Sequence, residues 1–361
     1  MSTSKSIYVI VGDIGGGKEL IPVATLLQAR GHIITWVVDR DGKVKDTLEK
    51  AGIAFLIDSS EVTVSAHPDL VLIGTSVTAT SAQMRWTNYF NAIRPVVWYE
   101  DLYGTGEVAK VRGCTSVRTI ITIDEVAQLI AANVWRDSKV VVGGKPTYGE
   151  TLSLLIPRRA ELRRSLRFQM HLEHSHDTPV VTYASMGESI ERVSAHIRAL
   201  GQAFDRGEKV IIRLHPKLKA SFDVLMNEAE NCFGDDLVDS SMIEDTTSVI
   251  LGSDIVVCYY GGDAPYQAAL AGIPVIMTMF PDCTEALTAR GYPNGVPPLL
   301  YAGACWGARD ANDMEILAAG LRKAPVAANA RIRETVRPLI PLLNPGSAGR
   351  IADIVESFFN Q

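Results

Sequence analysis

The amino-acid sequence predicts an α/β fold with two successive domains, each built on a parallel sheet covered by helices. Short β-branched runs alternate with helical segments up to residue 123, and a second series of the same kind begins after residue 176. Such alternation is typical of parallel sheets that carry helices on both faces. The chain has 361 residues, which is enough for two domains that each bury a core.

The first domain is expected to hold six strands joined in part by helices. We predict strands at residues 7–11, 33–38, 54–57, 70–73, 96–98 and 119–123. We predict helices at residues 19–28, 42–50 and 81–90.

The second domain repeats this pattern, and a polar stretch between about residues 143 and 177 separates the two. We predict strands at residues 180–184, 210–214, 255–258 and 275–279. We predict helices at residues 189–204, 221–231 and 264–271, and a further helix at residues 158–168 in the polar stretch.

Composition and charge exclude several classes of protein. With 47% hydrophobic and 21% charged residues, the chain is neither disordered nor fibrous. A net charge of -6 argues against a binder of duplex nucleic acid. There is no apolar run of 18 residues and no signal-peptide core, so we expect a cytoplasmic protein without a transmembrane segment. The five cysteines lack a CxxC pair, which is typical of reduced thiols.

A glycine-rich stretch, GDIGGGKELIP at residues 12–22, follows the first predicted strand and precedes a helix. We interpret it as a loop whose backbone N–H groups meet an anionic ligand. A tight turn that binds nothing stays open as the alternative. The spacing is not the dinucleotide fingerprint GxGxxG, because position 14 is Ile.

Three more loops follow predicted strands, where open α/β sheets bind their ligands. Glu100 and Asp101 end the fifth strand, where they either contact an acceptor or cap the next turn. The segment 185–189 (SMGES) opens a helix and suits a phosphate at its N-terminus. Gly261 and Gly262 lie between another strand and helix. Together with segment 185–189 and the glycine-rich stretch of the first domain, they suggest a diphosphate bound between the domains.

These motifs resemble those of glycosyltransferases of the GT-B fold, in particular peptidoglycan N-acetylglucosaminyltransferases and UDP-glycosyltransferases. The pattern GGxxxxP followed by RGH is similar to their first loop. Further similar segments follow in the same order: RPVVWYEDLYG at 94–104, VVGGKPTYGE at 141–150 and SDIVVCYYGGDAPYQAALAGIPVI at 253–276. RLHP at 213–216 is similar instead to non-hydrolysing UDP-sugar 2-epimerases and polyol-phosphate polymerases.

The resemblance implies two Rossmann-like domains with the ligand in a cleft between them. It implies an acceptor-binding domain at residues 1–150, a linker at 151–176 and a nucleotide-sugar-binding domain at 177–345. The C-terminal segment 346–361, with a helix at 349–359, is expected to pack back toward the first domain.

The resemblance also implies roles for individual residues. Glu19 stands where many members have a histidine that acts as catalytic base or contacts the acceptor, and Asp13 is the other acid of that loop. Gln267 stands where the family has a glutamate that holds the ribose, and Asp282 falls near the donor sugar. Glu100 and Asp101 would contact the acceptor. Eleven residues would bind the nucleotide or its diphosphate: Gly16, Gly17, Ser185, Gly187, Glu188, Arg213, His215, Gly261, Gly262, Asp263 and Gln267.

The function that follows is hexosyl or N-acetylhexosaminyl transfer from a nucleotide diphosphate sugar, expected to be UDP-linked, to an unidentified acceptor. Helix N-termini and basic side chains, rather than a metal or another cofactor, would stabilise the leaving diphosphate. Alternatives are a UDP-sugar 2-epimerase-like enzyme, a transferase of polyol phosphate from a CDP-linked donor, and a nucleotide-sugar-binding protein without turnover. The last is suggested by the replacements at positions 19 and 267.

Two further clusters carry weaker signals. His171, His174 and His176 lack a fourth ligand at zinc spacing. A group of arginines recurs at helical spacing and is interpreted as a solvated face, with a phosphorylated acceptor or an anionic lipid, and hence peripheral membrane contact, left open. These are Arg158, Arg159, Arg163, Arg164 and Arg167.

Overall fold

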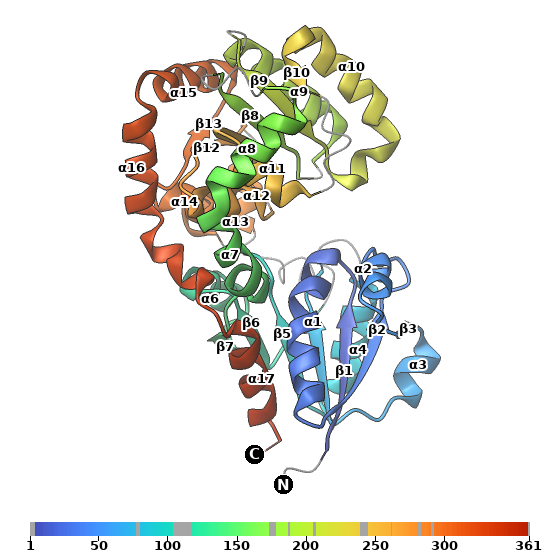
Figure 1. The fold of residues 1–361 in the computed structure, drawn as a ribbon. Coiled ribbons are helices and arrows are strands. Elements are labelled where there is room, and N and C mark those ends of the chain that lie inside the picture. The colour runs from blue at the N-terminus through green and yellow to red at the C-terminus, as the bar shows by residue number, and fades with distance from the viewer. Residues whose placement is uncertain are drawn as a thin grey trace. The chain divides into compact units, whose positions relative to one another are not determined.

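The computed structural model divides into two compact units, which are described separately (Figure 1). The N-terminal unit comprises Met1–Ser153, Ala289–Pro293 and Pro341–Gln361, and the C-terminal unit comprises Leu154–Thr288 and Asn294–Ile340. The structure describes residues 4–76, 80–103, 114, 117–172, 178–186, 188–204, 207–238, 245–260, 262–280, 283–289 and 292–359.

The N-terminal unit is built on a seven-stranded sheet in the order β3-β2-β1-β4-β5-β6-β7. Every neighbouring pair is parallel, as the alternating pattern predicts. The order reverses between β1 and β4, which is the place where open α/β sheets bind ligands. The strands are β1 (Ser6–Val11), β2 (Ile33–Val38), β3 (Phe55–Ile57), β4 (Leu70–Gly74), β5 (Val96–Tyr99), β6 (Thr119–Thr122) and β7 (Lys139–Val142).

Helices cover this sheet and bury a core that contains Trp86 and Trp98. The C-terminal helix α17 packs against α1 (Figure 1). Arg30, just after α1, forms ion pairs of 2.7 Å with Asp353 and Glu356. The helices are α1 (Ile14–Ala29), α2 (Lys45–Lys50), α3 (Ser60–Ser65), α4 (Ser81–Phe90), α6 (Glu125–Val134) and α17 (Ser347–Ser357).

The C-terminal unit has a six-stranded parallel sheet in the order β10-β9-β8-β11-β12-β13. Its strand order reverses between β8 and β11, and the central strands are fully buried. The strands are β8 (Val180–Ala184), β9 (Lys209–Arg213), β10 (Leu237–Val238), β11 (Ile255–Tyr259), β12 (Val275–Thr278) and β13 (Trp306–Ala308).

The helices of this unit lie on both sides of the sheet. In the stretch expected as a linker, α8 packs on α11, where Leu166 lies so close to Gly252 that a Cβ there would be 2.7 Å from Leu166 Cδ2. The helices that lie wholly or mainly in this unit are α7 (Ser153–Leu155), α8 (Arg159–Gln169), α9 (Ile190–Ala203), α10 (Phe222–Phe233), α11 (Thr246–Gly252), α12 (Ala264–Leu270), α13 (Cys283–Ala289), α14 (Pro298–Tyr301), α15 (Ala311–Lys323) and α16 (Pro325–Thr335).

The structure corrects the expected glycine loop. Helix α1 begins at Ile14, with Asp13 as its N-cap residue, so the three glycines lie within its first turns rather than in a loop. Even Pro22 lies inside this helix. Clustered glycine and proline usually interrupt helices, but here the packing of the helix against β4 decides the local structure.

The sequence patterns also missed β7, β10 and β13, which are short strands at the edges of the two sheets.

Candidate functional site

Residues that follow the strands of the N-terminal unit gather at the carboxyl edge of its sheet, the edge where the parallel strands end. Asp13 lies two residues after the end of β1, Ser76 two residues after β4, and Asp101 two residues after β5. The Asp13 N–H donates a hydrogen bond of 3.0 Å to Ser76 Oγ. This bond joins the loops on the two sides of the point where the strand order reverses, and it places the Asp13 side chain, which is partly exposed, at that point.

The glycines of α1 are explained by close packing. A Cβ at Gly16 would lie 3.3 Å from the backbone of Gly74, and one at Gly17 would lie 2.2 Å from Val44 Cγ2. At Gly15 the added atom would lie 2.1 Å from Asp101 Oδ2. Gly16 and Gly17 are buried against protein atoms, and their binding of a diphosphate stays a prediction. The N-terminus of α1 also lies beside the Asp101 carboxylate.

Glu19 is buried in a polar cluster that the sequence did not reveal. Its Oε1 lies 3.3 Å from Lys145 Nζ, and their side chains are only 3% and 1% exposed. The Thr147 N–H donates to Glu19 Oε2 at 2.8 Å, and the Thr147 hydroxyl donates to Oε1. Both carboxylate oxygens thus have donors. The pKa of nearby Glu150 is raised, mainly by burial and to a smaller extent by the negative charge of Glu19.

Lys145 connects this cluster to the predicted acceptor residues. Its Nζ donates a hydrogen bond of 2.6 Å to the backbone oxygen of Asp101. Glu100 is fully buried, and Asp101 is nearly so. The end of β5 is therefore held in place by a lysine that also neutralises Glu19. The contact of Glu100 and Asp101 with an acceptor stays a prediction, which a functional test must decide.

In the C-terminal unit, loops after β8 and β9 are joined at the carboxyl edge of the second sheet. The His215 N–H donates to Ser185 Oγ at 2.7 Å, and the Ser185 N–H donates to the Arg213 backbone oxygen at 3.0 Å. The Arg213 guanidinium donates to Thr246 Oγ1 at 3.1 Å, and burial lowers its pKa. His215 Nδ1 accepts from the Lys217 N–H at 3.2 Å, which is the local contact expected of a histidine before proline.

Glu188 anchors the loop after β8 to a buried histidine. Tyr183 donates to Glu188 Oε1 at 2.9 Å, and the Met186 N–H donates to Oε2. His196 Nδ1 lies 3.0 Å from the Tyr183 hydroxyl and 3.6 Å from Glu188 Oε1. Burial raises the pKa of Glu188, but its hydrogen bonds outweigh that effect and lower the pKa overall. Glu188 therefore positions this loop from within the unit.

The loop after β11 lies against the loop after β8. Gly262 has a φ of +78°, and a Cβ there would lie 1.5 Å from Met186 Cε. Asp263 is the N-cap residue of α12, and Gln267 Oε1 is buried without a hydrogen-bond partner in the described part of the chain. The structure thus brings Ser185, His215 and Gly262 to one edge. Gly187, Gly261 and Asp282 lie outside the described residues.

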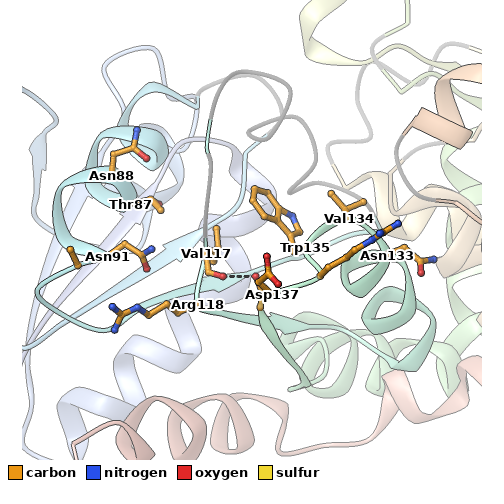
Figure 2. Close-up of a pocket in the computed structure, with 12 residues that line it drawn as sticks. Thr87, Asn88, Asn91, Val117, Arg118, Asn133, Val134, Trp135 and Asp137 are labelled. Carbon is orange, nitrogen blue, oxygen red and sulfur yellow. Dashed lines mark hydrogen bonds between the residues drawn. The ribbon is translucent and has the colours of Figure 1, made fainter.

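A cavity also lies elsewhere in the N-terminal unit. It has a volume of about 940 Å³ and is lined in part by Asn91, Arg118 and Trp135, next to the amino ends of β6 and β7 (Figure 2). In a parallel sheet this edge is opposite the one where Asp13 and Asp101 lie. We therefore place the candidate site at the carboxyl edges and not in this cavity.

Among the described residues, no group of three or more His, Cys, Asp or Glu side chains could hold a metal ion. His171 is described, whereas His174 and His176 are not. In the same part of the chain, no helix combines the length and apolarity that crossing a membrane requires.

Two Rossmann-like units with parallel sheets define the fold of GT-B glycosyltransferases, and solved structures match nearly the whole chain. MurG from Acinetobacter baumannii is 13% identical with a TM-score of 0.59, over 98% of this chain and 99% of that chain. HepE from Anabaena, solved with UDP-glucose, is 16% identical with a TM-score of 0.64, over 98% and 100%. A proposed UDP-N-acetylglucosamine 2-epimerase from Listeria monocytogenes is 13% identical with a TM-score of 0.64, over 99% and 97%. No protein-family model and no curated protein matches the sequence.

Proposed function

We propose that the protein transfers a sugar from a UDP-linked donor to a hydroxyl group of an acceptor. The observation that carries this proposal is the cluster of Ser185, His215 and Gly262 on three loops at the point where the second sheet reverses its strand order. Open parallel sheets bind nucleotides at this point. The same fold in HepE, which was solved with UDP and with UDP-glucose, supports the choice of donor.

In this proposal, residues of the C-terminal unit hold the donor. Helix α9 has 14 residues, and its N-terminal N–H groups and dipole would stabilise the charge that develops on UDP. Arg213 would add a positive charge at the same edge. The unpaired Gln267 Oε1 would accept a hydrogen bond from a ribose hydroxyl. These groups supply the stabilisation without requiring a metal ion.

We assign the general base to Asp13 rather than to Glu19. The base must take a proton from the acceptor hydroxyl while its oxygen attacks the anomeric carbon and the bond to UDP breaks. Glu19 is buried, its carboxylate oxygens already accept hydrogen bonds from Thr147, and it forms an ion pair with Lys145. These contacts favour a structural role for Glu19. Asp13 is partly exposed at the point where the first sheet reverses its strand order. Asp101 lies beside the N-terminus of α1, where it would orient the acceptor.

A thermal-shift panel tests the donor. The panel compares the melting temperatures measured with UDP, CDP, GDP and TDP and with the sugars linked to each. A nucleotide that binds should give a clear shift, because a ligand at 100 times its Kd stabilises the folded state by about 2.7 kcal/mol. We expect UDP and UDP-sugars to raise the melting temperature, and Gln267→Ala to reduce that rise. Gln202→Ala, which replaces an exposed glutamine, is the matched control. If no nucleotide shifts the melt, the donor assignment is wrong.

Two variants test the base. We expect Asp13→Asn to lower kcat by about 10²–10⁴-fold while UDP binding is unchanged. Glu19→Gln should act first on stability, and at a temperature where it is folded it should keep more activity than Asp13→Asn. The reverse order of activities would return the base role to Glu19.

The epimerase alternative rests on the RLHP segment and on the Listeria structure, whose TM-score equals that of HepE. Incubation with a UDP-sugar alone distinguishes it. Epimerisation of the sugar, or release of UDP without an acceptor, would favour that enzyme. Tight binding with no conversion, across a broad panel of acceptors, would favour a binding protein without turnover.

A further inference from the structure

We propose that a pocket in the C-terminal unit, lined by Arg159, Arg163 and Arg333, binds a phosphate group. The pocket has a volume of about 470 Å³ and lies between α8, the end of α12 and α16. Leu270 and Gly272 complete its wall. This inference does not depend on the proposed function.

The pocket is separate from the candidate donor site. Gly272 comes just before β12, and Ser253 and Asp254, which contact the pocket arginines, come just before β11. All of these residues therefore lie at the amino edge of the sheet, whereas Ser185 and Gly262 lie at the carboxyl edge. A ligand in this pocket would not be the reacting donor.

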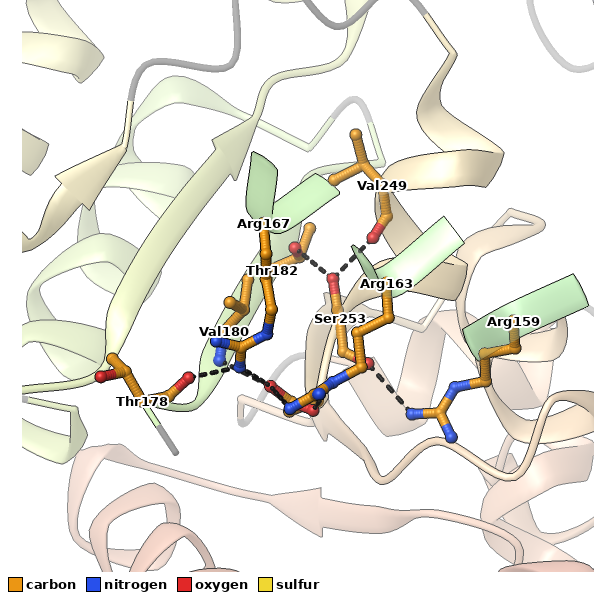
Figure 3. A network of polar contacts seen from close by, with 9 residues as sticks. Arg159, Arg163, Arg167, Thr178, Val180, Thr182, Val249 and Ser253 are labelled. Carbon is orange, nitrogen blue, oxygen red and sulfur yellow. Dashed lines mark hydrogen bonds and ion pairs between the residues drawn. The ribbon is translucent and has the colours of Figure 1, made fainter. Parts of the chain in front are cut away.

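The arginines at the pocket carry more positive charge than the neighbouring carboxylate of Asp254 can balance. Asp254 receives hydrogen bonds from Arg163 at 2.8 and 3.3 Å, and Arg167 also donates to it at 3.2 Å (Figure 3). One carboxylate is thus shared by two guanidinium groups. Arg159 instead donates to the Ser253 backbone oxygen at 3.2 Å (Figure 3). Among the described residues, no carboxylate forms an ion pair with Arg159, whereas Asp254 pairs with Arg163 and Arg167.

Arg159 also keeps unused hydrogen-bonding capacity. Its Nε is buried and has no hydrogen-bond partner in the part of the chain that the structure describes. Burial lowers the pKa of Arg159. The positive charges of Arg163 and Arg333 lower the pKa of Arg159 further, whereas the negative charge of Asp254 raises it. Three cations around one small cavity repel one another, and a bound anion would relieve that repulsion.

A phosphate group fits this arrangement because guanidinium groups bind its oxygens through paired, charge-assisted hydrogen bonds. Arg159 and Arg163 lie one helical turn apart on the same face of α8, and Arg333 approaches from α16. Arg333 is close to the glycine wall, since a Cβ at Gly272 would lie 3.4 Å from Arg333 Nε. The three side chains thus converge from two helices on one volume.

Isothermal titration with sodium phosphate and pyrophosphate tests the site. We expect the full chain to bind with a Kd of about 1 mM or tighter. Arg159→Gln and Arg333→Gln should each weaken binding by at least about 10-fold, as loss of one charge-assisted contact implies. The matched controls are Arg164→Gln on α8 and Arg331→Gln on α16, which remove equal charge from exposed positions outside the pocket.

The controls separate pocket binding from binding at the carboxyl edge. Equal binding by the pocket variants and the control variants would overturn the proposal, as would a wild-type protein that binds neither anion. Circular dichroism of each variant checks that the fold is retained. Arg163 is left unchanged because it also anchors Asp254.

A second arm identifies the source of the phosphate group. Co-sedimentation compares vesicles of phosphatidylcholine alone with vesicles that also contain phosphatidic acid. Binding to the acidic vesicles that Arg333→Gln abolishes and Arg331→Gln retains would assign a lipid headgroup. Binding of free phosphate with no such vesicle binding would assign a soluble phosphorylated ligand.

Discussion

Glu19 and Lys145 form an ion pair of 3.3 Å in the interior of the N-terminal unit, with both side chains almost fully buried. The pair ties α1 to the segment after β7, and through the Lys145 bond to Asp101 it also ties α1 to the end of β5. A charge pair in this position holds together three segments, two of which, α1 with its N-cap residue and the end of β5, carry the predicted acids. It explains how an apparent catalytic glutamate can serve the site without touching a substrate.

Breaking this pair should be costly. Lys145→Met would leave the Glu19 carboxylate buried without its cation, and we expect a loss of about 3–5 kcal/mol in the free energy of unfolding. Replacing both residues, Glu19→Leu with Lys145→Met, should recover much of that loss, because no buried charge remains. Urea denaturation of the single and double variants measures both effects.

The exposed pair Arg158–Glu161 provides the control, and Glu161→Gln should leave the unfolding midpoint unchanged. A Lys145→Met protein as stable as the wild type would show that the ion pair does not hold these segments together.

The glycines of α1 should differ in their tolerance of alanine. Gly16→Ala places its Cβ 3.3 Å from the backbone of Gly74, which cannot move aside as a side chain can, so the variant should be less stable than the wild type. Gly320→Ala in α15 meets no atom within 4 Å and should gain up to about 1 kcal/mol from helix propensity. Thermal melts compare the two. Equal gains at both positions would refute the packing explanation.

Gly15→Ala should act on activity instead. Its Cβ would lie 2.1 Å from Asp101 Oδ2, so the carboxylate must move. Under the proposed function, we expect kcat/KM for the acceptor to fall by up to about 100-fold, since a displacement near 1 Å can cost that much. UDP binding should be retained, because it is assigned to the other unit. Steady-state kinetics with the acceptor varied measures the change, and an unaltered kcat/KM would separate Asp101 from acceptor binding.

Acid should destabilise the C-terminal unit through Glu188. The pKa of this carboxyl is lowered from its ordinary value of 4.5, so its contribution to stability is present above pH 4.5. That contribution is lost as the pH falls through the lowered folded-state pKa. We expect the stability difference between the wild type and Glu188→Gln to shrink as the pH falls below 4.5, measured by urea denaturation at a series of pH values.

Tyr183→Phe provides a second variant for this prediction. It removes one hydrogen bond to the Glu188 carboxylate, so the loss of stability should begin at a higher pH than in the wild type. A pH profile that is identical in all three proteins would contradict the assigned role of Glu188.

Helix α17 should be necessary for the stability of the N-terminal unit. Ile351 is fully buried, and a Cβ at Gly143 would lie 2.7 Å from its Cγ1. We expect Ile351→Ala to cost about 2–5 kcal/mol in the free energy of unfolding. Ile316→Ala, at a position 61% exposed, should change it by less than about 0.5 kcal/mol. Similar small effects at both positions would mean that α17 is only loosely attached.

Strands with strong local patterns were predictable from the sequence. Residues 7–11 and 180–184 are short runs rich in β-branched and aromatic residues, and both became central strands of parallel sheets. Residues 306–308 carry no such pattern, and β13 forms at the sheet edge only because β12 lies beside it. Local propensity decides central strands, whereas short edge strands depend on their neighbours.

The candidate site was predictable only in part. The order of strands and loops sufficed to place Ser185, His215 and Gly262 at one edge, because the carboxyl ends of parallel strands share an edge. No local pattern could pair Glu19 with Lys145, since more than a hundred residues separate them along the chain and only packing brings them together.

The sequence by itself determined two α/β units, their parallel sheets and the loops where a ligand would bind, since hydrophobic periodicity and glycine spacing are local properties. Only the tertiary structure decided that GGG belongs to a helix, that Glu19 is neutralised by Lys145, and that Arg159, Arg163 and Arg333 converge on one pocket. Those features depend on distances between segments far apart in the chain. Such distances are set by the packing of whole helices and sheets.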